Sequence, residues 1–192
     1  PQAAVMCWYS DMYEGVDPPI AESARQCDWF LATSAGGFLQ GYKKLGIAHC
    51  AFMPNPCDPD VEHPGPTDSQ KQCGLLFTGK PTHGRGRQDP MRQELLETLT
   101  EHKGLTCRGG LNHPSVKGND YLDTIRGAKM TVSINAYNDV RLYHSDRLTH
   151  YLGCGAFVLA KYVPDSELLF EDKKHLCYFT SIEQCADLID YY

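Results

Sequence analysis

The stretch between Met130 and Lys161 constrains the fold of this chain more than any other. An apolar run ending at Asn135 is followed by a polar segment, a short helical pattern after Ser145, and a second apolar run at Ala156–Ala160. This order predicts strand, loop, helix and strand. A helix that joins two strands in this way is typical of a parallel sheet, so the stretch predicts an α/β fold.

The helix predicted after Ser145 begins at the carboxyl end of a strand, where anions are favoured. Free backbone N–H groups and the helix dipole both attract negative charge at such a position. Arg147 in the first turn adds a cation suited to phosphate, and His150 lies on a neighbouring part of the same helical face. Ser145 is well placed as the N-cap, and Gly153 and Gly155 are expected to end the helix.

The rest of the chain repeats this alternation of strands and helices. In the first 53 residues we expect strands at Ala3–Trp8, Trp29–Thr33 and Ala48–Met53, helices at Ile20–Gln26 and Gly37–Leu45, and a loop through Pro18 and Pro19. Later strands are expected at Cys73–Thr78, Leu105–Arg108, Lys129–Asn135 and Leu176–Phe179, with helices at Asp89–His102 and Asn119–Arg126 and from Ser181. The fold class is α/β, a Rossmann-type parallel sheet with helices on both faces and ligands at the carboxyl ends of its strands.

The composition changes sharply between Pro54 and Gln72, where five of the chain's twelve prolines fall among acidic and amide residues. This composition predicts an extended linker. The linker contains Asp58 and Asp60 in a D-x-D arrangement, a pair of carboxylates that can hold a divalent metal when the backbone fixes them. A proline-rich linker offers no strand end to fix two carboxylates, so we expect a solvated acidic turn and no metal.

A glycine-rich loop with basic residues follows the strand at Cys73–Thr78. It contains Gly79, Lys80, Arg85 and Arg87. The Walker A spacing fails here, because Pro81 replaces the required Ser or Thr. Glycines allow a phosphate to approach the backbone, and the basic side chains can bind it, although a solvated basic loop explains them equally well.

The order of these motifs resembles the C-terminal domain of GT-B glycosyltransferases. The resemblance is carried by Asn135, by D-V-R at 139–141, by S-D-R-L-T-x-Y-L-x-C-G-A-F-V-L at 145–159, and by V-P-D-S-E-L-L-F-E-D at 163–172. More narrowly, it is similar to the CgeB-like group of spore-maturation and phage-type transferases. Many relatives carry a glutamate that holds the donor ribose three residues after the arginine, and this chain has His150 there.

The resemblance implies a glycosyltransferase that moves a sugar from a nucleotide-sugar, with a UDP-sugar as the expected donor, to a hydroxyl acceptor without a metal. Residues 1–53 would be the C-terminal part of an acceptor-side lobe whose front is missing, 54–73 a proline-rich linker and 74–192 the donor-binding domain. The candidate catalytic residues are Asp11 as a base, Arg147 and His150. The candidate donor-binding residues are Gly79, Lys80, Arg85, Arg87, Tyr143, Ser145, Asp146, Arg147 and His150.

Other functions stay open at the level of sequence. With His150 where relatives carry glutamate, the domain is also consistent with a module that binds a nucleotide or glycan without turnover, or with a structural part of a larger assembly. Taken singly, Arg147 is also consistent with an ion pair to Asp146, and His150 with a helix-surface residue. A dinucleotide-dependent oxidoreductase is disfavoured, because no G-x-G-x-x-G follows the opening strand of a βαβ unit. The acceptor, whether a modified DNA base, a protein or a glycan, and the oligomeric state are not defined by these residues.

The composition disfavours several classes of protein. A net charge of -6 argues against a broad nucleic-acid footprint, and no apolar stretch reaches the length needed to span a bilayer. The nine cysteines are odd in number and contain no C-x-x-C, which disfavours a disulfide framework or a zinc ribbon. A cytoplasmic protein with free cysteines is the expected outcome.

Overall fold

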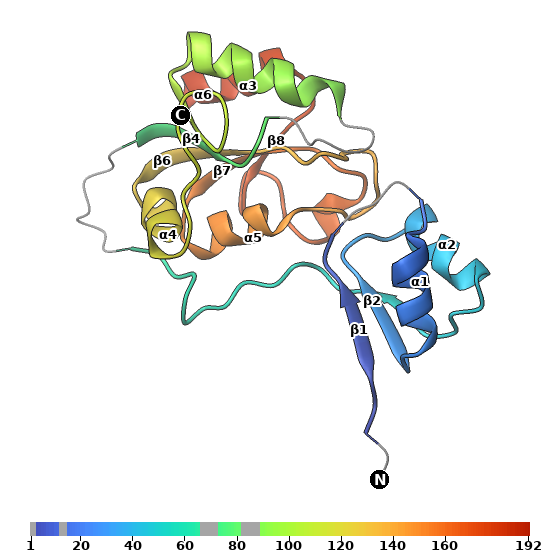
Figure 1. Ribbon diagram of the computed structural model, residues 1–192. Helices are drawn as coiled ribbons and strands as arrows, with labels where there is room; N and C mark the ends of the chain where they lie inside the picture. The colour runs from blue at the N-terminus through green and yellow to red at the C-terminus, as the bar shows by residue number, and fades with distance from the viewer. Residues whose placement is uncertain (1–2, 12–14, 66–72, 82–88) are drawn as a thin grey trace.

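The computed structural model describes residues 3–11, 15–65, 73–81 and 89–192 of the chain. These residues form two parallel sheets that share no strand, one of three strands and one of five (Figure 1). An α/β architecture was predicted from the alternation of strands and helices and is confirmed. Across the described ranges, no helix is long and apolar enough to cross a membrane.

The smaller unit is a sheet in the order β1-β2-β3 with helices packed on one face (Figure 1). Its elements are β1 (Met6–Tyr9), α1 (Pro18–Arg25), β2 (Trp29–Ala32), α2 (Gly37–Lys44) and β3 (Cys50–Phe52). The loop expected through Pro18 and Pro19 is wrong, because both prolines belong to the first turn of α1. Proline is tolerated there, since its missing N–H would have no partner within the helix.

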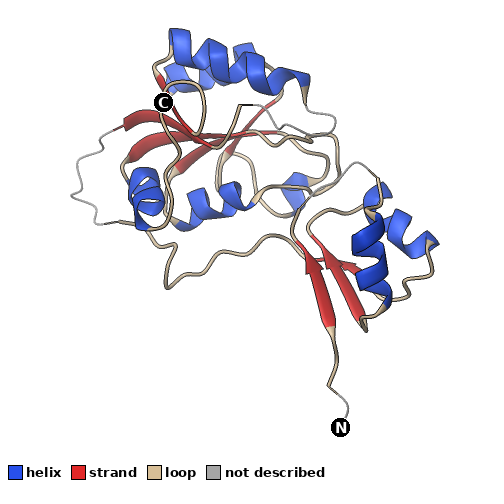
Figure 2. Cartoon of the chain, viewed as in Figure 1, coloured by secondary structure: helices blue, strands red, loops and turns tan. Residues whose placement is uncertain are grey.

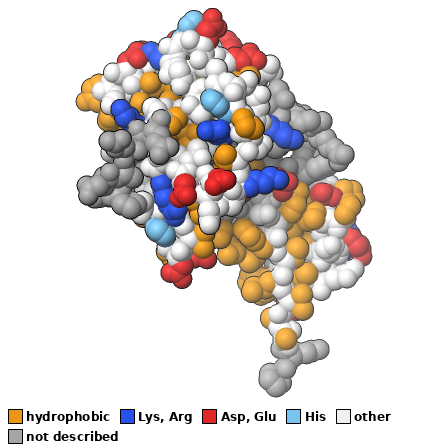
Figure 3. All heavy atoms as spheres, turned by 60° about the vertical axis from the view of Figure 1, so that its left-hand side comes forward, with side chains coloured by type: hydrophobic (Ala, Val, Ile, Leu, Met, Phe, Trp, Pro, Cys, Tyr) orange, Lys and Arg blue, Asp and Glu red, His pale blue; other side chains and the backbone are white. Residues whose placement is uncertain are grey.

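The other face of the smaller sheet carries large hydrophobic side chains that remain exposed. Met6, Trp8 and Trp29 are 67%, 43% and 44% exposed, while Phe30 and Ala32 are fully buried beneath the helices. In Figure 3 hydrophobic side chains gather over this part of the molecule. The smaller sheet is therefore covered on one face only among the described residues.

The larger unit is a sheet in the order β5-β4-β6-β7-β8, and all of its neighbouring strands are parallel. Its strands are β4 (Cys73–Thr78), β5 (Leu105–Arg108), β6 (Ala128–Ser133), β7 (Phe157–Lys161) and β8 (Cys177–Phe179). Its helices are α3 (Pro90–His102), α4 (Asn119–Arg126), α5 (Asp146–Gly153), the 3-10 turn η1 (Ser166–Leu168) and α6 (Ile182–Tyr191).

Helices cover both faces of the larger sheet, as Figure 2 shows. On one face α3 and α6 contribute Leu95, Leu99 and Cys185 to a buried cluster. On the other face α4 and α5 contribute Ile125 and Tyr151 to a second cluster. Strands buried on both faces explain why their sequences are apolar runs rather than alternating patterns.

The order of the strands reverses between β4 and β6. From β4 the chain crosses to β5 on one side, and it then returns to form β6 on the other side of β4. The helices that follow two such strands leave in opposite directions, so a crevice opens at their carboxyl ends. A ligand site is therefore expected at the carboxyl ends of β4 and β6.

The segment between the two sheets lies against the larger unit. We call its described part, residues 54–65, the strap. It has no helix or strand, and in Figure 1 it passes below α5 and α4 on its way from the smaller unit. An extended linker was expected there, and the contacts of the strap with α4 and α5 were not.

Candidate functional site

Arg147 joins the ends of β4 and β6 at the point where the strand order reverses. One guanidinium nitrogen of Arg147 donates to the carbonyl oxygen of Thr78 at 2.9 Å, and another donates to that of Ile134 at 2.8 Å. The guanidinium lies over the ring of Phe77, with its carbon 4.6 Å from the ring centre. The residue is only 9% exposed, so its charge sits largely inside the protein.

A second arginine, Arg92 of α3, lies beside the first. It is 1% exposed, and it donates to the carbonyl oxygens of Ile134, Lys80 at 2.7 Å and Pro81 at 3.1 Å. Burial and the charge of Arg147 lower the pKa of Arg92 to about 9. Both guanidinium groups donate to the carbonyl of Ile134, and the charge of Arg147 raises the cost of charging Arg92. We call Arg92 and Arg147 the arginine pair.

Within the described residues the arginine pair has hydrogen bonds to carbonyl groups and no ion pair with a carboxylate. No carboxylate forms an ion pair with either guanidinium within the part of the chain that the structure describes. The Nε atom of Arg147 is buried and has no acceptor among these residues. Buried charges are normally paired, because removing an ion from water costs several kcal/mol. The pair is therefore an electrostatic environment that favours an anion.

Gly79 makes room for Arg147 at the end of β4. Its φ of 127° lies in a region that favours glycine, and a Cβ atom there would lie 2.8 Å from the Nη1 atom of Arg147. The expectation that a glycine lets a phosphate approach the backbone remains a prediction. In the structure, the missing side chain of Gly79 leaves space for the guanidinium of Arg147.

The loop that leads into α5 is held by two asparagines. The side chain of Asn135 accepts a hydrogen bond from the N–H of Ser145 at 3.0 Å and donates to the carbonyl of Tyr143 at 3.3 Å. The side chain of Asn138 accepts from the N–H of Asn135 at 3.0 Å and donates to the carboxylate of Asp89 at 2.8 Å. These bonds satisfy buried backbone groups and fix where α5 begins.

Ser145 is the N-cap of α5, as predicted, but its side chain makes no capping bond. Its hydroxyl is buried without a partner in the described residues. The carboxylate of Asp146 instead accepts from the N–H of Arg147 at 2.8 Å. Asp146 therefore contacts the backbone of Arg147, while the guanidinium of Arg147 points to the strand ends. The start of α5 offers an unpartnered hydroxyl close to the arginine pair.

Tyr143 brings residues of the two units into electrostatic contact. Its side chain is 7% exposed, and burial raises the pKa of its hydroxyl. The carboxylate of Asp11 raises this pKa further, and the charge of Arg147 opposes the rise. Asp11 is an exposed residue that follows β1 of the smaller unit. The structure therefore brings Asp11, Tyr143 and Arg147 within electrostatic reach of one another.

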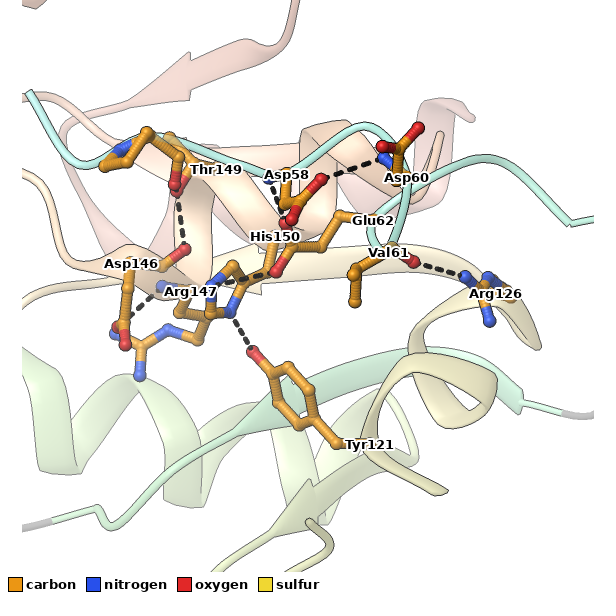
Figure 4. A network of polar contacts seen from close by, with 11 residues as sticks. Asp58, Asp60, Val61, Glu62, Tyr121, Arg126, Asp146, Arg147, Thr149 and His150 are labelled. Carbon is orange, nitrogen blue, oxygen red and sulfur yellow. Dashed lines mark hydrogen bonds and ion pairs between the residues drawn. The ribbon is translucent and has the colours of Figure 1, made fainter. Parts of the chain in front are cut away.

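His150 has partners on two other elements. Its Nε2 atom lies 3.4 Å from a carboxylate oxygen of Glu62 in the strap, and its Nδ1 atom lies 3.2 Å from the hydroxyl of Tyr121 in α4 (Figure 4). Arg147 contacts the ends of β4 and β6 instead. The two residues were expected to present one shared binding face, and the structure gives them separate sets of partners.

The remaining candidates lie at or beyond the edge of the described chain. Lys80 is exposed, and its backbone carbonyl accepts a hydrogen bond from Arg92. Arg85 and Arg87 lie outside the described residues.

The two carboxylates of the D-x-D sequence lie in a turn of the linker. The carboxylate of Asp58 accepts a hydrogen bond from the N–H of Asp60 at 3.0 Å.

A small pocket, with room for about one water molecule, adjoins this site. It lies between the ends of β6, β7 and β8 and the turn at η1, and Asn135, Tyr143 and His144 line it. The Nε2 atom of His144 is buried without a partner in the described chain, and burial lowers the pKa of the ring. His144 is therefore a buried, uncharged side chain next to the candidate site.

Arg92 and Glu62 are the residues that reading the sequence missed. Arg92 occupies the apolar stripe of α3 that also contains Leu95, Leu96 and Leu99, and a charge in such a stripe was the signal that could have identified it. Glu62 had no such signal, because it lies in an irregular segment.

Comparison with known proteins identifies the family. Residues 87–192, more than half of the chain, match a family described as glycosyl transferase-like, and the chain belongs to that family. A comparison with curated proteins gives no match.

Two solved structures share this fold. Anabaena HepE, solved in complex with UDP and glucose, is similar with a TM-score of 0.54 and 12% identity over 97% of this chain. Sucrose-phosphate synthase from Thermosynechococcus elongatus is similar with a TM-score of 0.50 and 12% identity over 90% of this chain. The chain spans 61% of the length of the first protein and 50% of the second.

Proposed function

We propose that this chain contains the donor-binding part of a glycosyltransferase that takes a sugar from a nucleotide-sugar, with a UDP-sugar as the first donor to test. The observation that carries the proposal is the buried arginine pair, which has no carboxylate partner in the described residues and lies where the strand order reverses. Family membership and the UDP bound by the structural neighbour HepE are consistent with it.

The diphosphate of the donor would lie between the turn at Gly79 and the start of α5. The Nε atom of Arg147, the hydroxyl of Ser145 and the side chain of Lys80 are the donors that this region offers. As the bond between sugar and phosphate breaks, negative charge grows on the leaving diphosphate. Preorganised cations and N–H groups stabilise such charge most strongly where water is excluded.

Asp11 is the proposed base. It lies on the smaller unit, at the carboxyl end of β1, and its charge reaches Tyr143 of the larger unit. In this position a carboxylate could accept the proton of an acceptor hydroxyl that attacks the sugar. The proposal leaves the acceptor open among a modified DNA base, a protein and a glycan.

Metal-independent transfer in the cytoplasm by an enzyme of the CgeB-like type is part of this proposal. The positive charges of the arginine pair can neutralise the negative charge of the diphosphate. In other transferases a divalent ion has this role. Titration with UDP in excess EDTA tests this point. An affinity equal to that measured with Mg²⁺ is expected, and a loss of binding that Mg²⁺ or Mn²⁺ restores would contradict it.

A binding module is the second candidate, and one observation favours it. Both ring nitrogens of His150 are already engaged within the protein, so His150 can contact a ribose only by exchanging a partner. A module of this kind would bind the nucleotide without turning it over. Release of UDP from a panel of UDP-sugars, with water or an added acceptor, separates the two functions: the transferase releases UDP and the module does not.

Calorimetric titration with UDP tests the proposed site itself. Arg147→Ala removes a charged donor from a largely buried site, so we expect the affinity for UDP to fall by about tenfold or more. Arg25→Ala is the matched control, because it removes an exposed arginine of α1 that pairs with Glu22. Equal affinities for the two variants would contradict the site.

A further inference from the structure

The strap is fastened to the larger unit by side chains at several points. The amide of Asn55 donates to the carbonyl of His144 at 2.8 Å. Arg126 of α4 donates to two strap carbonyls, those of Val61 at 2.8 Å and His63 at 3.0 Å. The strap is therefore held along its length by both the loop before α5 and the helix α4.

The end of α5 allows the strap to come close. A Cβ atom on Gly153 would lie 3.0 Å from the Cβ atom of Glu62 and 3.2 Å from its carbonyl oxygen. Any side chain at Gly153 would push this part of the strap away. The glycine that was expected only to help end the helix also sets the distance between α5 and Glu62.

Glu62 is held at both of its carboxylate oxygens. One oxygen accepts a hydrogen bond from the N–H of Asp58, and the other faces the Nε2 atom of His150 (Figure 4). The side chain of Glu62 is 13% exposed and that of His150 is 23% exposed. A mostly buried carboxylate with two fixed partners is better ordered than a surface ion pair.

The carboxylate favours a proton on one ring nitrogen of His150. A carboxylate offers only acceptor oxygens, so Glu62 attracts a proton on the Nε2 atom, 3.4 Å away, and repels a lone pair there. In the neutral ring the Nδ1 atom then accepts from the hydroxyl of Tyr121, which lies 3.2 Å away. A carboxylate that fixes the orientation and tautomer of a histidine in this way is a common supporting arrangement around protein sites.

His150 and Arg147 belong to the same helix, α5. At the end of β4, Thr78 donates its N–H to the hydroxyl of Tyr151 in α5 at 2.8 Å, and its carbonyl accepts from Arg147 at 2.9 Å. The contact of Glu62 with His150 therefore holds the helix that also carries Arg147.

We propose that Glu62 is a positioning residue of the donor site, which orients His150 on the helix that also carries Arg147. This inference rests on the proposed function for its effect on UDP binding. Glu62 does not touch the ligand. Through Glu62 the strap would support the donor site as well as connect the two sheets.

Two variants of the strap provide the test. Glu62→Leu removes the carboxylate that faces His150 but keeps a side chain of similar size. Asp60→Asn is the matched control, because it removes one negative charge from an exposed residue of the same strap. Long-range ¹H–¹⁵N spectra at neutral pH report which ring nitrogen of His150 is protonated, and calorimetry with UDP reports the effect on the site.

In the wild-type protein and in Asp60→Asn we expect His150 protonated at Nε2. In Glu62→Leu we expect a mixture of both tautomers and an affinity for UDP about tenfold lower. Asp60→Asn should bind UDP like the wild type. Exchanging the partners in Glu62→His/His150→Glu should recover most of the affinity, whereas His150→Glu alone sets two carboxylates against each other and should weaken binding.

Ring spectra of His150 that Glu62→Leu leaves unchanged would overturn the inference, whatever happens to UDP. Equal affinities in Glu62→Leu and Asp60→Asn, in a protein that binds UDP, would overturn it as well. A wild-type protein that binds no UDP but shows the expected ring spectra would contradict the proposed function instead, and the contact between Glu62 and His150 would stand.

Discussion

Gly79 is the single residue on which the geometry of the arginine pair most depends. Its positive φ turns the chain at the end of β4, and its missing side chain leaves space for the guanidinium of Arg147. A methyl group at this position meets a buried side chain that already holds two carbonyls, so it cannot be accommodated by a small rotation.

Gly79→Ala should therefore destabilise the protein by about 1–3 kcal/mol, through backbone strain and displacement of Arg147. Gly74→Ala is the control, because a Cβ atom there meets nothing within 4 Å and its φ is not positive. Urea unfolding of both variants measures the effect. Equal losses of stability would show that Arg147 does not need the space at Gly79.

His144 provides a prediction about pH. Burial lowers the pKa of its ring below the ordinary 6.5, so the unfolded chain binds a proton at a higher pH than the folded protein does. The free energy of unfolding should therefore fall as the pH drops below about 6.5, with a contribution from this group of up to about 1.4 kcal/mol per pH unit.

His144→Asn should remove this part of the pH dependence, and His102→Gln, at an exposed histidine of α3, should retain it. Urea unfolding at pH 7.5 and pH 5.5 gives the comparison. A slope in His144→Asn that matches the wild type would mean that His144 is protonated in the folded protein.

For single residues, the sequence predicted positions that depend on local spacing. It did not predict contacts with residues far away in the chain. Ser145 and Arg147 were placed correctly at the start of α5, because capping and helical spacing are local properties. The partners of Arg147 are carbonyls at the ends of two strands, and only the folded sheet brings them together. The charge of Arg92 in the apolar stripe of α3 was a local signal, but its place beside Arg147 depends on the folded sheet.

At the level of elements, the loop before α5 is the part of the site that a single substitution should disrupt most easily. It has no regular backbone hydrogen bonding, and Asn135 replaces that support by bonding to the N–H of Ser145 and the carbonyl of Tyr143. The side chain of Asn135 therefore provides the direct contact with the residues at the start of α5.

Asn135→Ala should increase amide exchange at residues 143–146 by about tenfold or more, because two buried backbone groups lose their partners. Asn112→Ala is a matched control. Its side chain bonds in the same two-sided way to the N–H of Cys107 and the carbonyl of Leu105. It should alter exchange near β5 and leave the loop unchanged. Similar exchange of residues 143–146 in both variants would contradict the role of Asn135.

The elements themselves were largely predictable, since apolar runs and helical spacing are properties of short stretches. The strand at Cys73–Thr78 and the helix at Asn119–Arg126 have the predicted bounds. The contact of Glu62 with His150 was not predictable, because it joins an irregular segment to a helix far along the chain. Proline content indicated an extended strap and gave no information about what the strap would touch.

At the scale of the whole molecule, the two sheets differ in how completely they are covered. The larger sheet is buried between two hydrophobic clusters, whereas the smaller sheet has one cluster and exposes Met6, Trp8 and Trp29 on its other face. Burial of apolar surface is the main source of stability, so the smaller sheet should be the weaker unit.

Both tryptophans of the chain, Trp8 and Trp29, lie in the smaller sheet, so tryptophan fluorescence reports on that unit alone. We expect the fluorescence transition in urea to occur at a lower concentration than the transition followed by far-ultraviolet circular dichroism. Coincident transitions would instead indicate that the two sheets unfold as one cooperative unit.

A nucleoside diphosphate is expected to bind at the carboxyl ends of β4 and β6, against the arginine pair. Amide hydrogen exchange with and without UDP tests it most directly, because it maps the protected backbone without presuming which residue matters. We expect saturating UDP to slow exchange at residues 78–81 and at the start of α5, residues 145–148, and to leave the exposed edge of the smaller sheet unaffected. Binding of UDP that protects other segments and leaves both of these unchanged would contradict it.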